Sequence, residues 1–303
     1  IAIYRYLTEE RQRRHIMQQF ASQTSPAIAA RVAENPALLE PVLREVTCYF
    51  SDLKGFTPIS EQLGPDRTIA MLQKYLDRMS DALLARDAFI SKFVGDAVFA
   101  LFNWPDLQED HRRRAVDSAI ATRDALQVFN RELKAMELPM LAMRIGLHTG
   151  PAQVGQCGSS RKSDYTAIGD TVNLASRLEG GNKFFGTWIM LSGVTADGLD
   201  GEFLLRPLGR IVVVGKAEPV EVFELVDRPD RVEPEVAKWA ADFAAALVLY
   251  QERRFRESAE AFTKLSAERP DDKATRFYLD LSRQLADQPP GEDWTDAIEL
   301  TEK

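Results

Sequence analysis

Residues Ser91–Ala100 read SKFVGDAVFA, two short β-forming runs on either side of a Gly95-Asp96 pair. A Gly-Asp pair between such runs predicts a tight hairpin turn, because glycine readily adopts the left-handed backbone that these turns need. The turn places Asp96 at a strand tip. Another β-rich run, Val46–Phe50, ends just before Asp52. The two stretches therefore predict two neighbouring strands, each with a carboxylate at its tip.

Two carboxylates at adjacent strand tips form a site of hard oxygen ligands. Mg²⁺ favours such a site, which combines one or two carboxylates with waters and the phosphates of a substrate. Taken singly, Asp52 and Asp96 each read as ordinary turn residues, because Asp is common in turns. Taken as a pair, they predict a divalent-metal site.

The composition is that of a globular protein, with 303 residues, 45% of them hydrophobic and 28% charged. The net charge is -8, and the sequence contains no basic block of the kind that binds nucleic acid. Recognition of an anionic ligand would therefore need a metal or local positive charge. Cys48 and Cys157 lie far apart without CxxC spacing, which predicts unpaired thiols in a reducing compartment. The sequence contains no run of 18 apolar residues, so it predicts no membrane-spanning helix.

Hydrophobic periodicity predicts the order strand, helix, hairpin, helix, strand, which is a ferredoxin-like split βαβ arrangement of the α+β class. Thr57 is a candidate N-cap with Pro58 at the first helical position. A turn is expected at 148–151 and a helix from Gly169-Asp170 onward. Later β-rich runs would add strands to the sheet. The expected ranges are strand 45–51, hairpin 89–102, helix 109–136, strand 142–147, and β-rich runs at 166–168, 188–191, 203–205, 211–214 and 220–225.

The flanks differ from this core, so we divide the chain into residues 1–43, 44–227 and 228–303. The first part reads either as a solvated linker helix or as a signalling helix, and its start at Ile1 indicates a fragment. The last part predicts three helices near the pattern of a single tetratricopeptide unit, or a simple docked helical hairpin. One such unit cannot bury its apolar face alone, so it should pack on the core or on a partner. The tail from Glu292 is expected to fray.

Three blocks carry a family resemblance: FSDLKGFT at 50–57, KFVGDAVFALF at 92–102 and DYTAIGDTVNLASRLEG at 164–180. In content, order and spacing they resemble the signature blocks of the class III nucleotidyl cyclase catalytic domain, over about residues 44–226. The resemblance implies the α+β fold already predicted, with extra strands. It also implies that Asp52 and Asp96, with the backbone carbonyl of Leu53, hold two Mg²⁺ or Mn²⁺ ions per site. One ion would acidify the ribose 3′-hydroxyl and the other would hold the triphosphate.

Lys92 and Thr166 are the candidate base-reading pair. Lysine donates only, which suits adenine N1, and a threonine oxygen can accept from the adenine N6 amino group. Family members specific for GTP have glutamate at the position of Lys92, so lysine favours ATP. Many adenylyl cyclases have aspartate where Thr166 stands, and threonine resembles the subgroup in which bicarbonate can act as a regulator. Because threonine both donates and accepts, some turnover of GTP is compatible with it.

Asn173 and Arg177 lie four residues apart, so they share one face of the predicted helix. The resemblance implies that Asn173 positions the ribose and that Arg177 stabilises the transition state, where a guanidinium can meet charge on the phosphate oxygens. One departure stands at Val214, where the family usually has a phosphate-binding lysine. Lys216 is two residues further on, nominally on the same strand face, and is the candidate triphosphate contact. Arg161 or Lys162 could also reach the phosphates.

The resemblance as a whole implies an adenylate cyclase that converts ATP to 3′,5′-cyclic AMP and pyrophosphate at sites shared across a homodimer. The lack of a basic block predicts no nucleic-acid partner. An upstream sensor is expected in the full-length protein, with the chain as the cytoplasmic part of a membrane-anchored protein whose anchor would lie in a missing N-terminal region. Two alternatives are a guanylate cyclase and a non-catalytic nucleotide-sensing regulatory module. Lys92 argues against the first, and the complete residue set argues against the second.

Overall fold

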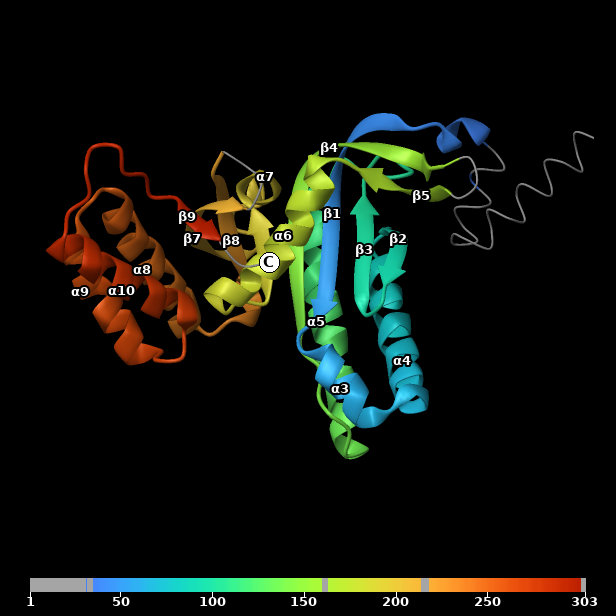
Figure 1. The fold of residues 1–303 in the computed structure, drawn as a ribbon, viewed down its shortest axis with the longest axis horizontal. Helices are drawn as coiled ribbons and strands as arrows, with labels where there is room; N and C mark the ends of the chain where they lie inside the picture. Colours follow the sequence, from blue (N-terminus) through green and yellow to red (C-terminus); the bar gives the residue numbers. More distant parts are fainter. Residues whose placement is uncertain (1–30, 32–34, 160–162, 214–217, 301–303) are drawn as a thin grey trace, which may run out of the picture.

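A computed structural model describes residues 31, 35–159, 163–213 and 218–300 (Figure 1). Most of the expected lead-in helix, together with Arg161, Lys162, Val214 and Lys216, lies outside these residues. Within the described part of the chain, no helix combines the length and apolar character needed to cross a membrane.

The strands of the described residues form one mixed sheet with the order β2-β3-β1-β4-β6-β8-β7-β9, and β5 pairs beside it with β4. The first four run antiparallel in the order β2-β3-β1-β4, which confirms the predicted split βαβ arrangement. The strands are β1 Val42–Leu53, β2 Phe89–Val94, β3 Ala97–Phe102, β4 Met143–Gly158, β5 Ser163–Ile168, β6 Ile189–Ser192, β7 Leu204–Val213, β8 Val220–Asp227 and β9 Ile298–Leu300.

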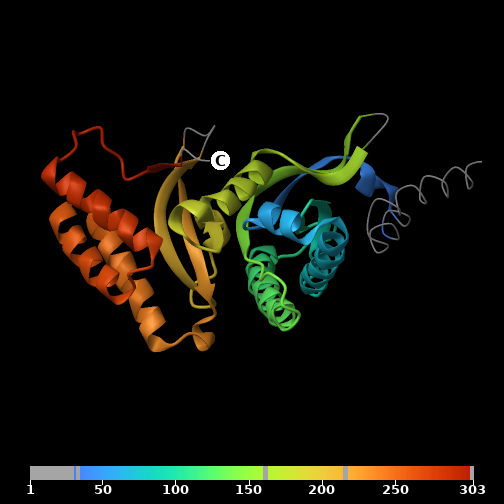
Figure 2. The ribbon, with the colours of Figure 1, turned by 60° about the horizontal axis from the view of Figure 1, so that its bottom comes forward.

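Helices cover both faces of this sheet (Figures 1 and 2). One face packs against α4 and α5, whose apolar stripes, including Tyr75, Met79 and Phe129, form a core with Tyr49 and Leu147. The helices and 3₁₀ turns are η1 Pro36–Leu39, α3 Phe56–Leu63, α4 Pro65–Leu84, α5 His111–Ala135, α6 Asp170–Phe185, α7 Gly193–Ala196, η2 Pro229–Arg231, α8 Pro234–Gln251, α9 Phe255–Glu268 and α10 Lys273–Asp287.

Helix α6 crosses the opposite face in direct backbone contact with β4. A Cβ atom built on Gly146 would lie 2.2 Å from both the Ala175 carbonyl oxygen and the Glu179 backbone nitrogen. Real Cβ atoms do not approach so closely, so only glycine permits this packing. The close approach sets how near the side chains of α6 come to the ends of β1 and β4.

Strand β4 is longer than expected, and the predicted turn at 148–151 is wrong. Pairing with β1 continues through it, with Thr47 opposite Thr149 and Val46 opposite Gly150. The C-terminal part of β4, from Gln153 to Gly158, pairs with β5. Residues of these two strands form a second, smaller hydrophobic core with residues of β1, β2 and β3. Tyr165 of β5 packs edge-on against Phe89 of β2, with ring centroids 5.5 Å apart. The β4–β5 arm therefore reaches across the sheet to β2.

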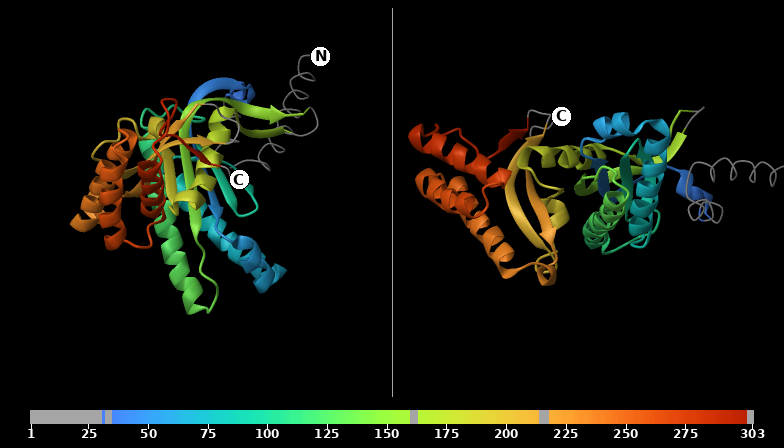
Figure 3. Two further views of the ribbon diagram at one scale, coloured as in Figure 1. Left: turned by 60° about the vertical axis from the view of Figure 1, so that its left-hand side comes forward. Right: turned by 90° about the horizontal axis from the view of Figure 1, so that it is seen from below.

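The three C-terminal helices form as expected and share one core with α6 and β6–β8 (Figure 3). Arg206 of β7 is 1% exposed and pairs with Glu224 of β8 and Asp272, the N-cap of α10. Its guanidinium also lies over the ring of Trp239, 4.2 Å from the ring centroid. The helices thus pack on the sheet that precedes them. The tetratricopeptide interpretation and the domain division stay predictions.

Two expectations for the end of the chain are wrong. The β-rich runs expected at 203–205 and 211–214 are not two separate strands, because one strand, β7, runs from Leu204 to Val213. The tail does not fray throughout, because Ile298–Leu300 adds to β7 as parallel strand β9. Ile298 and Leu300 are buried in the core beneath the C-terminal helices, which gives this short strand an apolar anchor.

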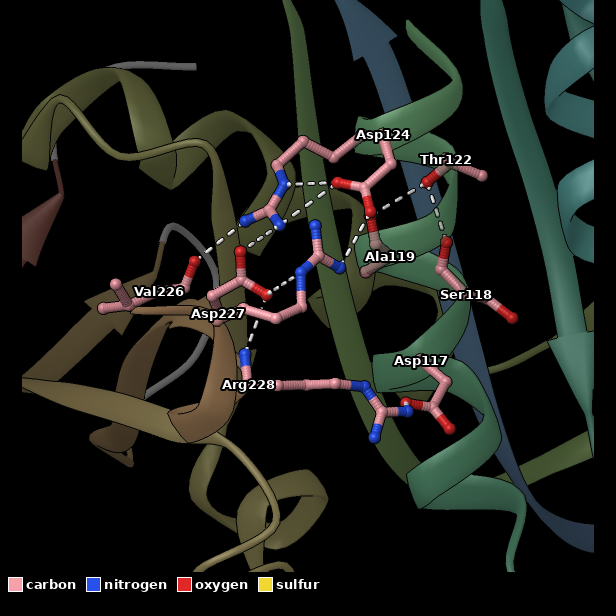
Figure 4. A network of polar contacts seen from close by, with 10 residues as sticks. Asp117, Ser118, Ala119, Thr122, Asp124, Val226, Asp227 and Arg228 are labelled. Atoms are coloured by element: carbon pink, nitrogen blue, oxygen red, sulfur yellow. Dashed lines mark hydrogen bonds and ion pairs between the residues drawn. The ribbon is translucent and has the colours of Figure 1, made fainter. Parts of the chain in front are cut away.

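The segment that leaves the sheet toward α8 is tied to α5 by a polar network (Figure 4). Arg123 donates to the Val226 carbonyl at 2.8 Å and to the Asp227 carboxylate at 2.6 Å. Arg228 pairs with Asp117 on the same helix. These charged hydrogen bonds and ion pairs fix the segment between β8 and α8 to α5, and they hold the outer strands against the ferredoxin-like core.

Candidate active site

The two predicted metal carboxylates meet at the end of β1. Ser51 pairs with Val98, so Asp52 comes beside the turn that joins β2 and β3. The Leu53 backbone N–H donates to Asp96 Oδ2 at 3.1 Å. Gly95 has φ of 65°, the left-handed conformation that the predicted turn requires. The structure therefore brings Asp52, Leu53 and Asp96 together, as the sequence predicts.

The loop after this site differs in detail from the prediction. Helix α3 begins at Phe56, and its N-cap is Gly55 with φ of 67°. The interpretation of Thr57 as the N-cap is therefore wrong. Glycine at 55 lets the chain turn sharply after β1, which leaves the Leu53 backbone at the carboxylate pair.

The electrostatics of the pair favour a cation. Burial, and then the charge of Asp96, raise the pKa of Asp52 to about 6, although Arg144 opposite it on β4 acts in the other direction. A divalent cation bound between the two carboxylates would offset the negative charge that raises the pKa of Asp52. Among the described residues no cluster of three or more His, Cys, Asp or Glu side chains could hold a metal. A two-carboxylate site suits Mg²⁺ or Mn²⁺, which take their remaining ligands from waters and substrate phosphates.

Glu179 is a residue that the sequence analysis missed. It lies on α6 beside Gly146, and its pKa is raised to about 7 by burial and then by the charge of Asp52. The sequence placed Glu179 two residues after Arg177 in the third signature block, which was the only hint of a role in the site. Spacing along a helix does not show which strand the helix covers, so the nearness of Glu179 to Asp52 could not be predicted. Glu179 adds a third acidic group to the electrostatics of the carboxylate pair.

The candidate base-reading residues lie on β2 and β5, which the β4–β5 arm brings together. Lys92 Nζ lies 3.5 Å from Asp164 Oδ2, and both side chains are partly exposed. Next to it, Ser91 Oγ donates to Thr166 Oγ1 at 2.8 Å. Thr166 is buried, with 4% of its surface exposed. The sequence analysis named Lys92 and Thr166 but missed their partners Ser91 and Asp164.

Asn173 and Arg177 lie on the first turns of α6, as the sequence predicts. Asn173 is exposed and Arg177 is partly exposed. Neither side chain has a hydrogen-bond or ion-pair partner in the part of the chain that the structure describes. They are therefore available to a ligand. The remaining candidate, Lys216, lies outside the described residues.

Comparisons of the sequence with a family model and with curated proteins indicate the same family. Residues 40–226 match the family model described as the adenylate and guanylate cyclase catalytic domain. Adenylate cyclase 1 of Rhizobium meliloti (strain 1021) is 40% identical over 183 residues, which is 60% of this chain and 28% of that protein. The adenylate cyclase of Anabaena cylindrica is 34% identical over 206 residues, which is 65% of this chain and 40% of that protein.

The fold is similar to that of the adenylyl cyclase CyaB from P. aeruginosa. The TM-score is 0.60 with 34% sequence identity, covering 64% of this chain and all of that one. The chain thus spans less than half the length of the two curated relatives, while the structural match covers the whole of the solved CyaB chain. Since the family model covers more than half of the chain and the structural match agrees with it, the chain belongs to the class III adenylate and guanylate cyclase family.

Proposed function

We propose that the chain is an adenylate cyclase that converts ATP to 3′,5′-cyclic AMP and pyrophosphate. The observation that carries this proposal is the meeting of Asp52 and Asp96 around the Leu53 backbone, with a pKa of about 6 at Asp52. These residues would hold two Mg²⁺ or Mn²⁺ ions. When bound, the ions would acidify the ribose 3′-hydroxyl and neutralise phosphate charge.

The other residues would position ATP for an in-line displacement. The ribose 3′-oxygen forms a bond to the α-phosphorus, and the bond from that phosphorus to the β-phosphate bridging oxygen breaks. Pyrophosphate leaves, and the hydroxyl proton goes to solvent or to a substrate phosphate. Asn173 would hold the ribose, and Arg177 would donate to the phosphate oxygens where charge accumulates. The exposed position of Asn173 and the partly exposed position of Arg177 on α6 support these roles.

Lys92 carries the choice of ATP over GTP in this proposal. Lysine can donate to adenine N1, whereas guanine presents an N–H there and would clash with a donor. Thr166 would accept from the adenine N6 amino group. The Ser91–Thr166 and Lys92–Asp164 contacts, which bring β2 and β5 together, support this assignment. Lys216 would contact the triphosphate.

We further propose that two chains form a homodimer with two equivalent sites. One subunit would supply Asp52 and Asp96, and the other would supply Lys92, Thr166, Asn173 and Arg177. We also propose that the chain lies in the cytoplasm and that an upstream sensor domain in the full-length protein controls it. The two cysteines support a reducing compartment, because neither forms a disulfide among the described residues.

Incubation of the purified chain with ATP or GTP, in Mg²⁺ or Mn²⁺, tests the proposal. Cyclic AMP should form, with specific activity that rises with protein concentration as the dimer assembles. Asp52→Ala should abolish turnover, whereas Asp77→Ala, a matched change at an exposed position on α4, should not. A folded dimer that makes no cyclic product would instead indicate a nucleotide-sensing module. Constant specific activity on dilution, with a monomer in sedimentation, would contradict the shared site.

A further inference from the structure

Strand β2 is irregular at the residue before the candidate base-reading lysine. Ile90 pairs with Ala100 and Lys92 pairs with Phe99, which are consecutive residues of β3. Ser91 is therefore an extra residue of β2 with no partner of its own on β3. A β-bulge of this kind leaves one residue out of the ladder and redirects the side chains beside it. Consecutive side chains of a regular strand point to opposite faces, but here both Ser91 and Lys92 contact β5.

The two contacts differ in strength. Ser91 Oγ donates to Thr166 Oγ1 at 2.8 Å and lies 3.4 Å from the Tyr165 carbonyl oxygen. A serine hydroxyl has one proton, so the shorter contact, to Thr166, is the main bond. The Lys92–Asp164 pair is longer, at 3.5 Å, and its side chains are 39% and 54% exposed. Thr166 is held firmly, whereas Lys92 remains free to move toward a ligand.

We infer that Ser91 is a positioning residue for base selection, acting through the hydroxyl of Thr166. This inference rests on the proposed function, in which Thr166 accepts from adenine N6. A hydroxyl oxygen has two lone pairs. The bond from Ser91 occupies one of them and fixes the oxygen, which leaves the other for the adenine amino group.

Guanine should depend less on this arrangement. It has the acceptor O6 where adenine has its amino group, so it cannot donate to the lone pair of Thr166 that the bond from Ser91 leaves free. Removal of the Ser91 hydroxyl therefore weakens recognition of ATP more than that of GTP. Ser91 does not contact the reacting phosphate or ribose in this scheme, so the chemical step should be unaffected.

Steady-state kinetics of Ser91→Ala with both nucleotides test the inference. The KM for ATP should rise by about three- to tenfold, the effect of one neutral hydrogen bond, while kcat for ATP stays within about twofold. The ratio of kcat/KM for ATP to that for GTP should fall accordingly. Ser91→Thr, which keeps a hydroxyl, should restore most of the ratio. The matched control is Ser163→Ala, which removes the hydroxyl that accepts from Gln156 on the outer part of the same arm.

A second measurement keeps this test separate from the test of turnover. A fluorescent ATP analogue bound to each variant is displaced with ATP or GTP, and the ratio of their affinities is compared. If the wild-type chain binds nucleotides but forms no cyclic product, the proposed function fails while the role of Ser91 is still measured. An unchanged ratio in Ser91→Ala, or an equal loss for both nucleotides, overturns the inference. A wild-type chain that binds neither nucleotide overturns both.

Discussion

Replacing Asp52 with Asn should stabilise the metal-free chain at pH 8, even though it should abolish turnover. The pKa of Asp52 is raised from 3.8 to about 6 by burial and by the charge of Asp96. A carboxylate whose pKa is raised in the folded state opposes folding when it is ionised. That cost is complete above pH 6 and disappears as the pH falls from 6 toward 3.8. Asn is uncharged, so the variant avoids the cost at every pH.

The size of the effect follows from the pKa shift. A difference of about two pKa units corresponds to at most about 3 kcal/mol at pH 8. Partial access of solvent to the site screens the repulsion, so we expect a gain of about 1–2 kcal/mol. At pH 5, midway between the two pKa values, the gain should fall to about half, because Asp52 is then protonated in the folded chain but still ionised in the unfolded chain. An Asn amide can also donate to Asp96 as the protonated carboxyl does, which preserves the local geometry.

Urea unfolding in the presence of EDTA, at pH 8 and at pH 5, measures this gain. Asp77→Asn, at an exposed position on α4, serves as the control and should change stability by less than about 0.5 kcal/mol at both values. Destabilisation of Asp52→Asn at pH 8, or an equal change at the two pH values, would refute the proposed repulsion between the carboxylates.

Three further outcomes are expected. Arg206→Met should cost about 3–5 kcal/mol in urea unfolding at pH 7.5, because it leaves two largely buried carboxylates without their cationic partner, whereas Arg210→Met, at a partly exposed ion pair, should cost far less. A small loss for Arg206→Met would show that the C-terminal helices do not depend on this residue. Arg177→Ala should lower kcat for cyclic AMP formation by about a hundredfold without changing thermal stability, and a kcat within about twofold of wild type would remove it from the transition state. Binding of Mn²⁺ should weaken by up to about tenfold per pH unit below about 6, since a proton competes for Asp52; calorimetric titration from pH 5 to 7.5 checks this, and a flat profile would contradict it.

Much of the fold could be predicted because its signals are local. The Gly95-Asp96 turn, the period of the helices and the order of elements each depend on residues close together in the chain. The errors fell where tertiary packing overrides such signals. The run at 148–151 looks like a turn, yet pairing with β1 on one side keeps it extended. Residues 298–300 look like a tail, yet the core beneath α8–α10 buries them.

The candidate site divides in the same way. The residue types and their spacing determined which side chains could hold metal, read a base or meet a phosphate, because those abilities belong to the side chains themselves. Only the tertiary structure decided which of them meet. Glu179 comes near Asp52 because α6 rests directly on Gly146, and Ser91 reaches Thr166 because β2 bulges and the β4–β5 arm crosses the sheet. Such contacts join segments far apart in the chain, and the packing that forms them leaves no periodic trace in the sequence.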